Sequence, residues 1–344
     1  PFMQLSRTLK LIAACLAVGL TLPTAAQDKS PIKILIGFPP GGSTDTVARV
    51  LGEKLSVVLK QPVIVDNKPG AGGLLAAQAL KAAAPDGLTY MIAPNATPWG
   101  NGYIDYLKLV NARGGINGVK IVFEECETGY ATDRIVECYE RLKGMHGGAT
   151  LFQPLSTGGT FALTEKAPVD KIPLITAGYG RSESQNGAVF TWNFPLLGTY
   201  WVGSDVAIQY IAKKLGGVAN LKGKKIALVY HDSPYGKEAI PVLEELSKKY
   251  GYSVQLLPVA APGVEQKATW LQIRQNRPDF VLLSGWGVMN LTALREAQAT
   301  GYPRDKMLGN WWSGAEPDVA DIGEGAKGYS ALTLQHGAER NSKV

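Results

Sequence analysis

Residues 226–259 read IALVYHDSPYGKEAIPVLEELSKKYGYSVQLLPV, and this stretch determines the expected fold class. Residues 226–230 are a short apolar run typical of a buried strand, and residues 253–259 are a second strand of this kind. Residues 237–250 between them are predicted to form a helix. A strand, a helix and a strand in succession predict two parallel strands joined by a right-handed crossover.

The same alternation continues on both sides of this stretch. Downstream strands are expected at 280–284, 307–310 and 329–334, with helices at 267–276 and 291–299. Upstream strands are expected at 119–124, 148–153, 172–177 and 189–193, with helices at 103–113, 132–143 and 161–165 and another within 196–215. The chain is therefore predicted to be an α/β protein with parallel sheets. Such sheets bind ligands at the carboxyl ends of their strands.

A separate βαβαβ pattern precedes these elements. Strands are expected at 32–37, 62–66 and 88–93, with helices at 45–59 and from Gly70 to near Ala84. Glycines follow the first strand, and Ser43 or Thr44 can cap the helix that begins after them. Such a corner can hold an anion on free backbone amides, but it is also an ordinary strand-to-helix turn.

Composition excludes several classes of protein. The chain has 344 residues, which suggests about two domains. Hydrophobic residues make up 45% and charged residues 19%, so a disordered chain is not expected. The formal charge of +6 is modest and argues against nucleic-acid binding. The glycine corner lacks the lysine of a P-loop and the GxGxxG of a dinucleotide fold, and the histidines lie far apart. No enzymatic activity, cofactor or metal is therefore expected.

Residues 1–26 are predicted to be a cleaved signal peptide. Arg7 and Lys10 precede an apolar run at 11–22, and small residues end the segment at Ala26. Lipoprotein modification at Cys15 is the alternative. Export places the mature protein in the periplasm, an oxidising compartment. Cys126 and Cys138 can then form a disulfide, or they can remain two small buried thiols.

Residues 31–97 resemble the start of a solute receptor of the tripartite tricarboxylate transporter family. The matching motifs are FPPGGSTDTVAR (38–49), VDNKPGAGG (65–73) and APDGLTYMIAP (84–94). The resemblance implies a clamp on an organic acid. It makes a second anion site of Gly42, Ser43, Thr44 and Asp45 an expectation to be tested.

Residues 99–344 resemble the leucine/isoleucine/valine-binding type of periplasmic protein, the receptor of ABC importers. The matching motifs are NARGGINGVKI (111–121), PLSTGGT (154–160), PLITAGYG (173–180), VYHDSPYGKE (229–238), DFVLLSGWG (279–287) and GNWWSGAEPDV (309–319). The resemblance implies a two-lobed type I periplasmic-binding-protein fold. Lobe 1 would comprise 99–200 and 328–344, and lobe 2 would comprise 201–327. The resembled family continues beyond the point corresponding to Val344, so a truncated C-terminal end is expected.

The second resemblance also implies a ligand site at the strand ends. Its residues are Ser156, Thr157, Ala177, Gly178, Tyr179, Tyr235, Trp286 and Trp312. Trp312 stands near the place where amino-acid binders carry an acid for the ligand ammonium group, which favours an organic acid, an amide or an aromatic compound. The expected function is that of a monomeric periplasmic receptor delivering a small solute, such as a branched-chain or aromatic amino acid, to an ABC permease. A tricarboxylate receptor, or a non-functional hybrid fragment, is the alternative.

The junction between the two resemblances raises a question of strand pairing. Residues 88–93 stand where the second family has the first strand of its lobe 1. A strand has only two edges, so this segment cannot serve both sheets fully. Our hypothesis is that it joins the larger sheet, which would leave residues 31–84 peripheral.

Overall fold

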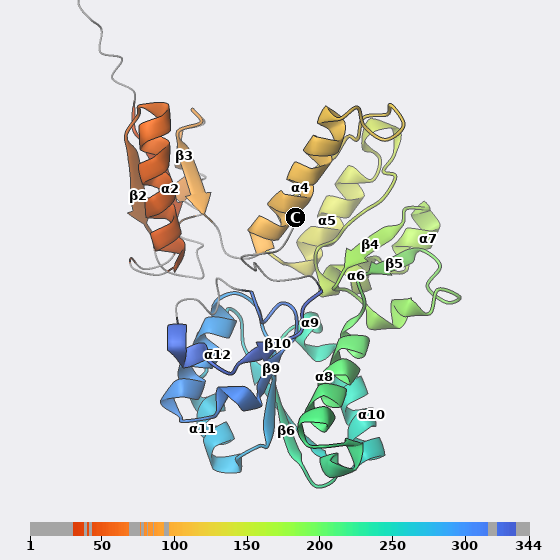
Figure 1. The fold of residues 1–344 in the computed structure, drawn as a ribbon. Helices are drawn as coiled ribbons and strands as arrows, with labels where there is room; N and C mark the ends of the chain where they lie inside the picture. Colours follow the sequence, from red (N-terminus) through yellow and green to blue (C-terminus); the bar gives the residue numbers. More distant parts are fainter. Residues whose placement is uncertain are drawn as a thin grey trace, which may run out of the picture.

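The computed structural model describes residues 30–37, 40, 43–68, 76, 79–80, 82–84, 86–92, 96–315 and 322–334. The expected signal peptide, with Cys15, and most of the helix expected from Gly70 lie outside the described residues. The strands of the described chain form three sheets, in the orders β2-β1-β3, β4-β5 and β10-β9-β8-β6-β7. Every ladder between these strands is parallel, which confirms the predicted α/β class (Figure 1).

The five-stranded sheet forms the centre of what we call the second lobe, residues 200–334. Its strands are β6 (Lys225–His231), β7 (Ser253–Val259), β8 (Phe280–Ser284), β9 (Met307–Gly309) and β10 (Ser330–Ala331). Helices α8 (Tyr200–Lys214) and α10 (Ile240–Tyr250) lie on one side, and α11 (Lys267–Asn276) and α12 (Val288–Ala299) on the other (Figure 1). The bounds predicted for β7, α11 and β8 are confirmed.

Alternating side chains of β6 supply both cores of this lobe. Ile226 and Leu228 pack toward α8 and α10, whereas Ala227 and Val229 pack toward α11 and α12. All four are at most 1% exposed. Burial of a leucine-sized side chain contributes roughly 1.5–3 kcal/mol to folding. This two-sided burial explains why residues 226–229 of the strand are all apolar rather than apolar at alternate positions.

What we call the first lobe, residues 96–196, has a much smaller sheet. It contains β4 (Leu174–Ala177) and β5 (Asn193–Leu196), and its helices are α4 (Ala96–Ala112), α5 (Thr132–Leu142), α6 (Thr157–Leu163) and α7 (Lys166–Asp170). Its core gathers buried side chains from α5, α6 and β4, namely Ile135, Tyr139, Leu163 and Leu174. Short elements complete the chain: α9 (Pro234–Lys237), and 3-10 turns at Met145–Gly147, Ser182–Gln185, Val218–Leu221, Arg304–Lys306 and Gly323–Ala326.

The hypothesis that residues 88–93 join the larger sheet is wrong. They form β3 (Thr89–Ile92), which pairs with β1 (Ile32–Ile36) in the N-terminal sheet. The strand predicted at 119–124 is also wrong, because residues 120–127 have no strand structure. Of the strand predicted at 148–153, a single bridge from Phe152 to Leu174 remains. Among the described residues, no strand of the N-terminal sheet pairs with the first-lobe sheet.

Other contacts hold the segment 120–127 in place. The side-chain amide of Asn111 donates to Ile121 O and accepts from Ile121 N, both at 2.7 Å, as a neighbouring strand would. Cys126 and Cys138 form a disulfide with a Cα separation of 6.0 Å, which ties the segment to α5. The Asn111 side chain and the disulfide thus hold this segment where no strand-to-strand hydrogen bonds do so.

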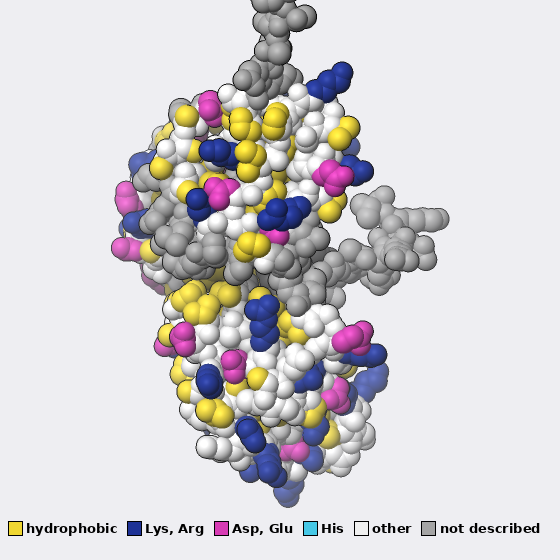
Figure 2. All heavy atoms as spheres, turned by 90° about the vertical axis from the view of Figure 1, so that its left-hand side faces the viewer, with side chains coloured by type: hydrophobic (Ala, Val, Ile, Leu, Met, Phe, Trp, Pro, Cys, Tyr) yellow, Lys and Arg dark blue, Asp and Glu magenta, His cyan; other side chains and the backbone are white. Residues whose placement is uncertain are grey.

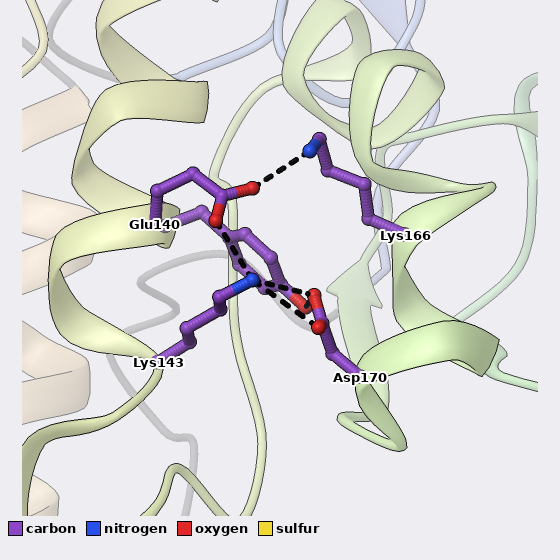
Figure 3. A network of polar contacts seen from close by, with 5 residues as sticks. Glu140, Lys143, Lys166 and Asp170 are labelled. Carbon is purple, nitrogen blue, oxygen red and sulfur yellow. Dashed lines mark hydrogen bonds and ion pairs between the residues drawn. The ribbon is translucent and has the colours of Figure 1, made fainter.

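A polar network fastens α5 to α7 (Figure 3). Lys143 Nζ lies 2.7 Å from Glu140 and 3.1 Å from Asp170, and Lys166 Nζ lies 2.7 Å from Glu140. The buried Tyr139 donates its hydroxyl to Asp170 at 2.9 Å, and burial, followed by this bond, raises its pKa. The lysine and glutamate groups are substantially exposed, so each ion pair contributes little to stability. The network orients the helices more than it stabilises them.

The N-terminal unit consists of the three-stranded sheet and α2 (Ser43–Leu59), with β2 spanning Val63–Asn67. Ile34, Ile36 and Ala48 form its small buried core. The outer side of α2 exposes Val57 by 73% and Val58 by 76%. Figure 2 shows apolar side chains among charged ones on the face of this unit that points away from the first lobe. Among the described residues, no helix combines the length and apolar composition that a membrane crossing requires.

The β6 core of the second lobe makes a stability prediction. Leu228→Ala should reduce the free energy of unfolding by about 2–5 kcal/mol, because it leaves a cavity between β6 and the helices α8 and α10. Leu271→Ala in α11 is the matched control and should change it by less than about 1 kcal/mol, since Leu271 is 43% exposed. Urea unfolding followed by circular dichroism measures both, and equal losses would contradict the assigned core.

Candidate functional site

Aromatic side chains from both lobes meet in one cluster at the lobe junction. Tyr179 of the first lobe and Tyr200 and Tyr235 of the second are 6%, 5% and 3% exposed. Four partly buried side chains pack against them: Leu155, Trp286, Trp311 and Trp312. Tyr200 stacks on Trp311 with ring centroids 5.3 Å apart and an angle of 6° between the planes. The cluster therefore joins the two lobes through a shared apolar surface.

The strands place most of these residues. Tyr179 follows β4, Tyr235 lies in the short helix after β6, Trp286 follows β8, and Trp312 follows β9. Parallel strands put their carboxyl ends at one edge of a sheet, so the loops that follow them converge. Tyr200 differs, because it begins α8, the first helix of the second lobe.

The carbonyl oxygen of Gly178 links the lobes directly. It accepts the indole N–H of Trp311 at 2.6 Å and that of Trp312 at 3.2 Å. Trp312 Nε1 also lies 2.9 Å from the Tyr200 hydroxyl. Gly178 has φ +71°, a region in which glycine is strongly favoured. The backbone turn after β4 thus presents its carbonyl to two tryptophans of the other lobe.

The phenols of the cluster are neutral. Tyr235 donates to Gly285 O at 3.0 Å, and its hydroxyl oxygen accepts Asn310 Nδ2 at 2.9 Å. Burial raises the pKa of both Tyr200 and Tyr235 well above the ordinary value for tyrosine. The site therefore offers uncharged hydrogen-bonding groups between aromatic walls.

Two hydroxyls lie at the start of α6. Ser156 is 3% exposed and accepts Gly159 N at 3.2 Å, which caps the helix. Thr157 is 1% exposed and accepts Gly180 N at 3.3 Å. Each uses its oxygen as an acceptor in these bonds, and Ser156 also hydrogen-bonds with Tyr130 and Thr157 with Tyr200. Leu155, with φ +44°, turns the chain just before them.

The structure brings most of the predicted site residues into one region. The cluster contains four of them: Tyr179, Tyr235, Trp286 and Trp312. The Gly178 carbonyl accepts hydrogen bonds from two tryptophans of the cluster, and Thr157 accepts one from Gly180 N in the turn after β4. Ser156 adjoins Thr157, and Ala177 ends β4, where it is partly buried. Sequence reasoning missed four residues that contact the cluster: Tyr130, Tyr200, His231 and Asn310. His231 directly follows the strand predicted at 226–230, and that position was the available signal.

The second predicted anion site is only partly described. Gly42 and the side chains of Ser43 and Thr44 lie outside the described residues. Asp45 is 2% exposed, and its carboxylate accepts Arg49 Nε at 2.8 Å and Asn67 Nδ2 at 2.9 Å. A buried carboxylate repels an anion, so Asp45 fastens α2 to β2 instead of donating to a ligand.

A buried carboxyl group also bridges the lobes. Glu238 Oε2 accepts Ser182 N at 2.9 Å, and Glu238 O accepts Trp201 Nε1 at 3.0 Å. Glu238 is 8% exposed, and burial raises its pKa. This contact lies outside the aromatic cluster and holds the first lobe against the second.

A small hollow of about 30 Å³ adjoins the cluster on the second-lobe side. Its walls are mostly apolar and come from α8, α10 and the ends of the central strands. Tyr200, Asn310 and Trp311 border it and also belong to the junction. The cluster therefore has adjoining space on one side.

Comparison with known proteins gives a family match. The family model described as "Periplasmic binding protein" matches residues 72–341. The "Leu/Ile/Val-binding protein homolog 8" of Brucella abortus is 27% identical over 207 residues, 58% of this chain and 50% of that protein. The "UPF0065 protein in gbd 5'region" of Cupriavidus necator is 50% identical over 93 residues, 26% of this chain and 28% of that protein. The chain thus spans half of one relative and under a third of the other.

Solved structures give a consistent fold. A chain described as an "abc transporter permease from pseudomonas fluorescens group" is 48% identical, with a TM-score of 0.59, covering 67% of this chain and 57% of that one. A branched chain amino acid ABC transporter from Thermus thermophilus with bound valine is 18% identical, with a TM-score of 0.60, covering 88% and 64%. The second likeness supports the predicted type I periplasmic-binding-protein fold.

The turn at Gly178 should not tolerate an added methyl group. Gly178→Ala should lower the free energy of unfolding by about 1–3 kcal/mol more than Gly198→Ala. An added Cβ at Gly178 would lie 2.7 Å from Leu334 Cδ1 and 3.2 Å from Trp311 Nε1. Gly198 also has a positive φ, but nothing lies within 4 Å of its added Cβ. Urea unfolding separates the two variants, and equal losses would show that the junction tolerates the methyl group.

The Glu238 bridge makes a prediction about pH. Folding raises the pKa of the Glu238 carboxyl group, because burial favours its protonated form. The protonated carboxyl group therefore adds to the free energy of unfolding below the ordinary glutamate pKa, and this contribution is lost as the pH rises through the folded-state pKa. Glu238→Gln cannot ionise and should gain stability relative to the wild type as the pH rises above the ordinary glutamate pKa of about 4.3. Glu244→Gln on the exposed side of α10 is the control for charge removal. If both variants follow the same pH dependence in urea unfolding, burial of Glu238 is unimportant.

Proposed function

The chain belongs to the periplasmic binding protein family, and on that basis we propose that it captures a small solute between its two lobes for delivery to an ABC permease in the inner membrane. The observation that supports this most directly is the meeting of strand-end side chains from both lobes in one cluster. A receptor that closes on its ligand needs groups from both lobes at a common point, and hinge motion then opens and closes the site. Its location would be the periplasm, after removal of residues 1–26.

The chemistry of the cluster favours an organic acid or amide as the ligand. Ser156 and Thr157 would donate to a carboxylate or carbonyl oxygen, and Tyr235 and Trp286 would cover its apolar body. The cluster is made of aromatic and aliphatic side chains, with Trp312 where an acid would meet an ammonium group. Branched-chain and aromatic amino acids stay in the proposal because the Brucella abortus relative is described as a Leu/Ile/Val-binding homologue. No catalytic step is part of the proposal.

The expected lobes were 99–200 with 328–344 and 201–327; we propose that lobe 1 ends before α8 and resumes only after β10, and that the working form is a monomer. One detail favours a later return to lobe 1: Ser330 and Ala331 extend the second-lobe sheet by pairing with Leu308 and Gly309. The crossing back would then follow β10. The chain passes between lobes for the first time between β5 and α8.

A composite origin is proposed for the two ends of the chain. The N-terminal unit forms its own sheet, with β3 paired to β1. The 93-residue likeness to the Cupriavidus necator protein has a length suited to this unit, whereas the 207-residue likeness suits the remainder. A receptor role for the N-terminal unit toward tricarboxylates is the second candidate. The internal pairing of Asp45 with Arg49 and Asn67 weighs against it.

A thermal-shift screen of residues 27–344 tests the proposed function. We expect one class among aromatic acids, branched-chain acids, amides, amino acids and citrate to raise the melting temperature, since a ligand that binds only the folded state stabilises it. Ser156→Ala should then weaken binding about tenfold or more, because a donor to the ligand oxygen is lost. Ser247→Ala, which removes a hydroxyl on α10 that donates to Glu244 O, should leave affinity unchanged. No shift with any class would reject the receptor, and a shift with citrate alone would favour the second candidate.

A further inference from the structure

Three aromatic side chains form a group beside the cluster. Tyr130 lies in the turn before α5, His231 ends β6, and Trp286 follows β8. The ring of Trp286 has its centroid 5.6 Å from that of Tyr130 and 5.8 Å from that of His231. Tyr130 comes from the first lobe and the other two from the second. Trp286 is therefore held between rings supplied by both lobes.

The indole nitrogen of Trp286 is a donor without an acceptor. It is buried and has no hydrogen-bond partner in the part of the chain that the structure describes. The indoles of Trp311 and Trp312, a short distance away, both reach the Gly178 carbonyl. Buried donors are almost always paired, so an unpaired one at a lobe junction indicates a partner from outside the chain. Because the free group is an N–H, that partner must carry an acceptor and not a cation.

The histidine ring beside Trp286 is neutral. His231 is 4% exposed, its Nδ1 lies 2.9 Å from Ser233 Oγ, and burial lowers its pKa, which favours the neutral ring. The neighbouring Asp232 already pairs with Lys237 at 2.7 Å. A ligand atom that accepts the Trp286 N–H would thus lie among neutral hydrogen-bond donors and the faces of aromatic rings.

Tyr130 links the start of α6 to Trp286. Its hydroxyl hydrogen-bonds with Ser156 while its ring contacts Trp286. Its φ of +62° is unusual for a non-glycine residue, and 38% of its surface is exposed. A partly exposed ring in an unusual backbone conformation thus lies next to the buried indole.

We propose that Tyr130, His231 and Trp286 form a subsite for the far end of an aromatic acid, with the Trp286 N–H donating to an oxygen opposite the carboxylate. This inference rests on the proposed function, because the carboxylate is assigned to Ser156 and Thr157. Tyr130 and His231 supply the ring contacts. The indole N–H supplies the selectivity, since a site built to donate to an oxygen discriminates against a ligand that lacks it.

The test compares 4-hydroxybenzoate with 4-methylbenzoate, which has a methyl group in place of the hydroxyl. Isothermal titration calorimetry should show roughly tenfold tighter binding of 4-hydroxybenzoate to the wild-type protein. Trp286→Phe keeps a ring and removes the N–H, so its ratio of the two Kd values should fall to about two or less. Trp192→Phe, a tryptophan packed on the first-lobe core, should keep the wild-type ratio.

A second variant keeps the inference testable if Trp286→Phe does not fold. Tyr130→Leu removes a half-exposed ring and should weaken both benzoates about tenfold while 4-methylpentanoate binding changes less than twofold. Equal binding of the two benzoates to the wild type, or an unchanged ratio in Trp286→Phe, would overturn the subsite and leave the proposed function standing. If aliphatic acids or amides bind and neither benzoate does, the subsite alone is wrong. If no acid or amide binds, both are wrong.

Discussion

A β-strand has two edges, and the pairing of β3 with β1 determines what remains of the first lobe. β1 has β2 on one edge and β3 on the other, so β1 is paired on both edges and β3 lies at the edge of the N-terminal sheet. The segment 120–127 has no strand structure. The Asn111 amide and the Cys126–Cys138 disulfide hold it in place. The second lobe is unaffected, because all five of its strands come from residues 225–331.

The junction between the lobes depends on neutral polar groups. One backbone carbonyl, that of Gly178, accepts two indole N–H groups from the other lobe. Phenols that burial keeps protonated fill the surrounding space. Ionised groups pay a large desolvation penalty in such a place, whereas hydroxyl and indole groups are compatible with it when they are paired. The unpaired indole of Trp286 stands out against this background.

The sequence predicted the second lobe well because each of its elements is locally consistent. β6 is apolar on both faces, Gly251 ends α10 with φ +75°, and helices of ordinary length separate the strands. The first lobe was predicted less well. Residues 119–124 carry the pattern of a strand, but a strand needs a neighbour, and pattern alone does not supply one. The error at residues 88–93 has the same cause, since either sheet could have accepted that strand.

The sequence by itself determined the α/β class, the parallel order and the residues that follow each strand, because these depend on local periodicity and on chain connectivity. It therefore placed Ser156, Tyr179, Tyr235 and Trp286 at strand ends. Only the tertiary structure decided which of these side chains touch and which hydrogen-bonding groups remain open. Tyr130 and Tyr200 contact rings of the candidate site. The Asp45 carboxylate instead accepts hydrogen bonds from Arg49 and Asn67. Those outcomes depend on distances between residues far apart in the chain, which are set by how the lobes pack.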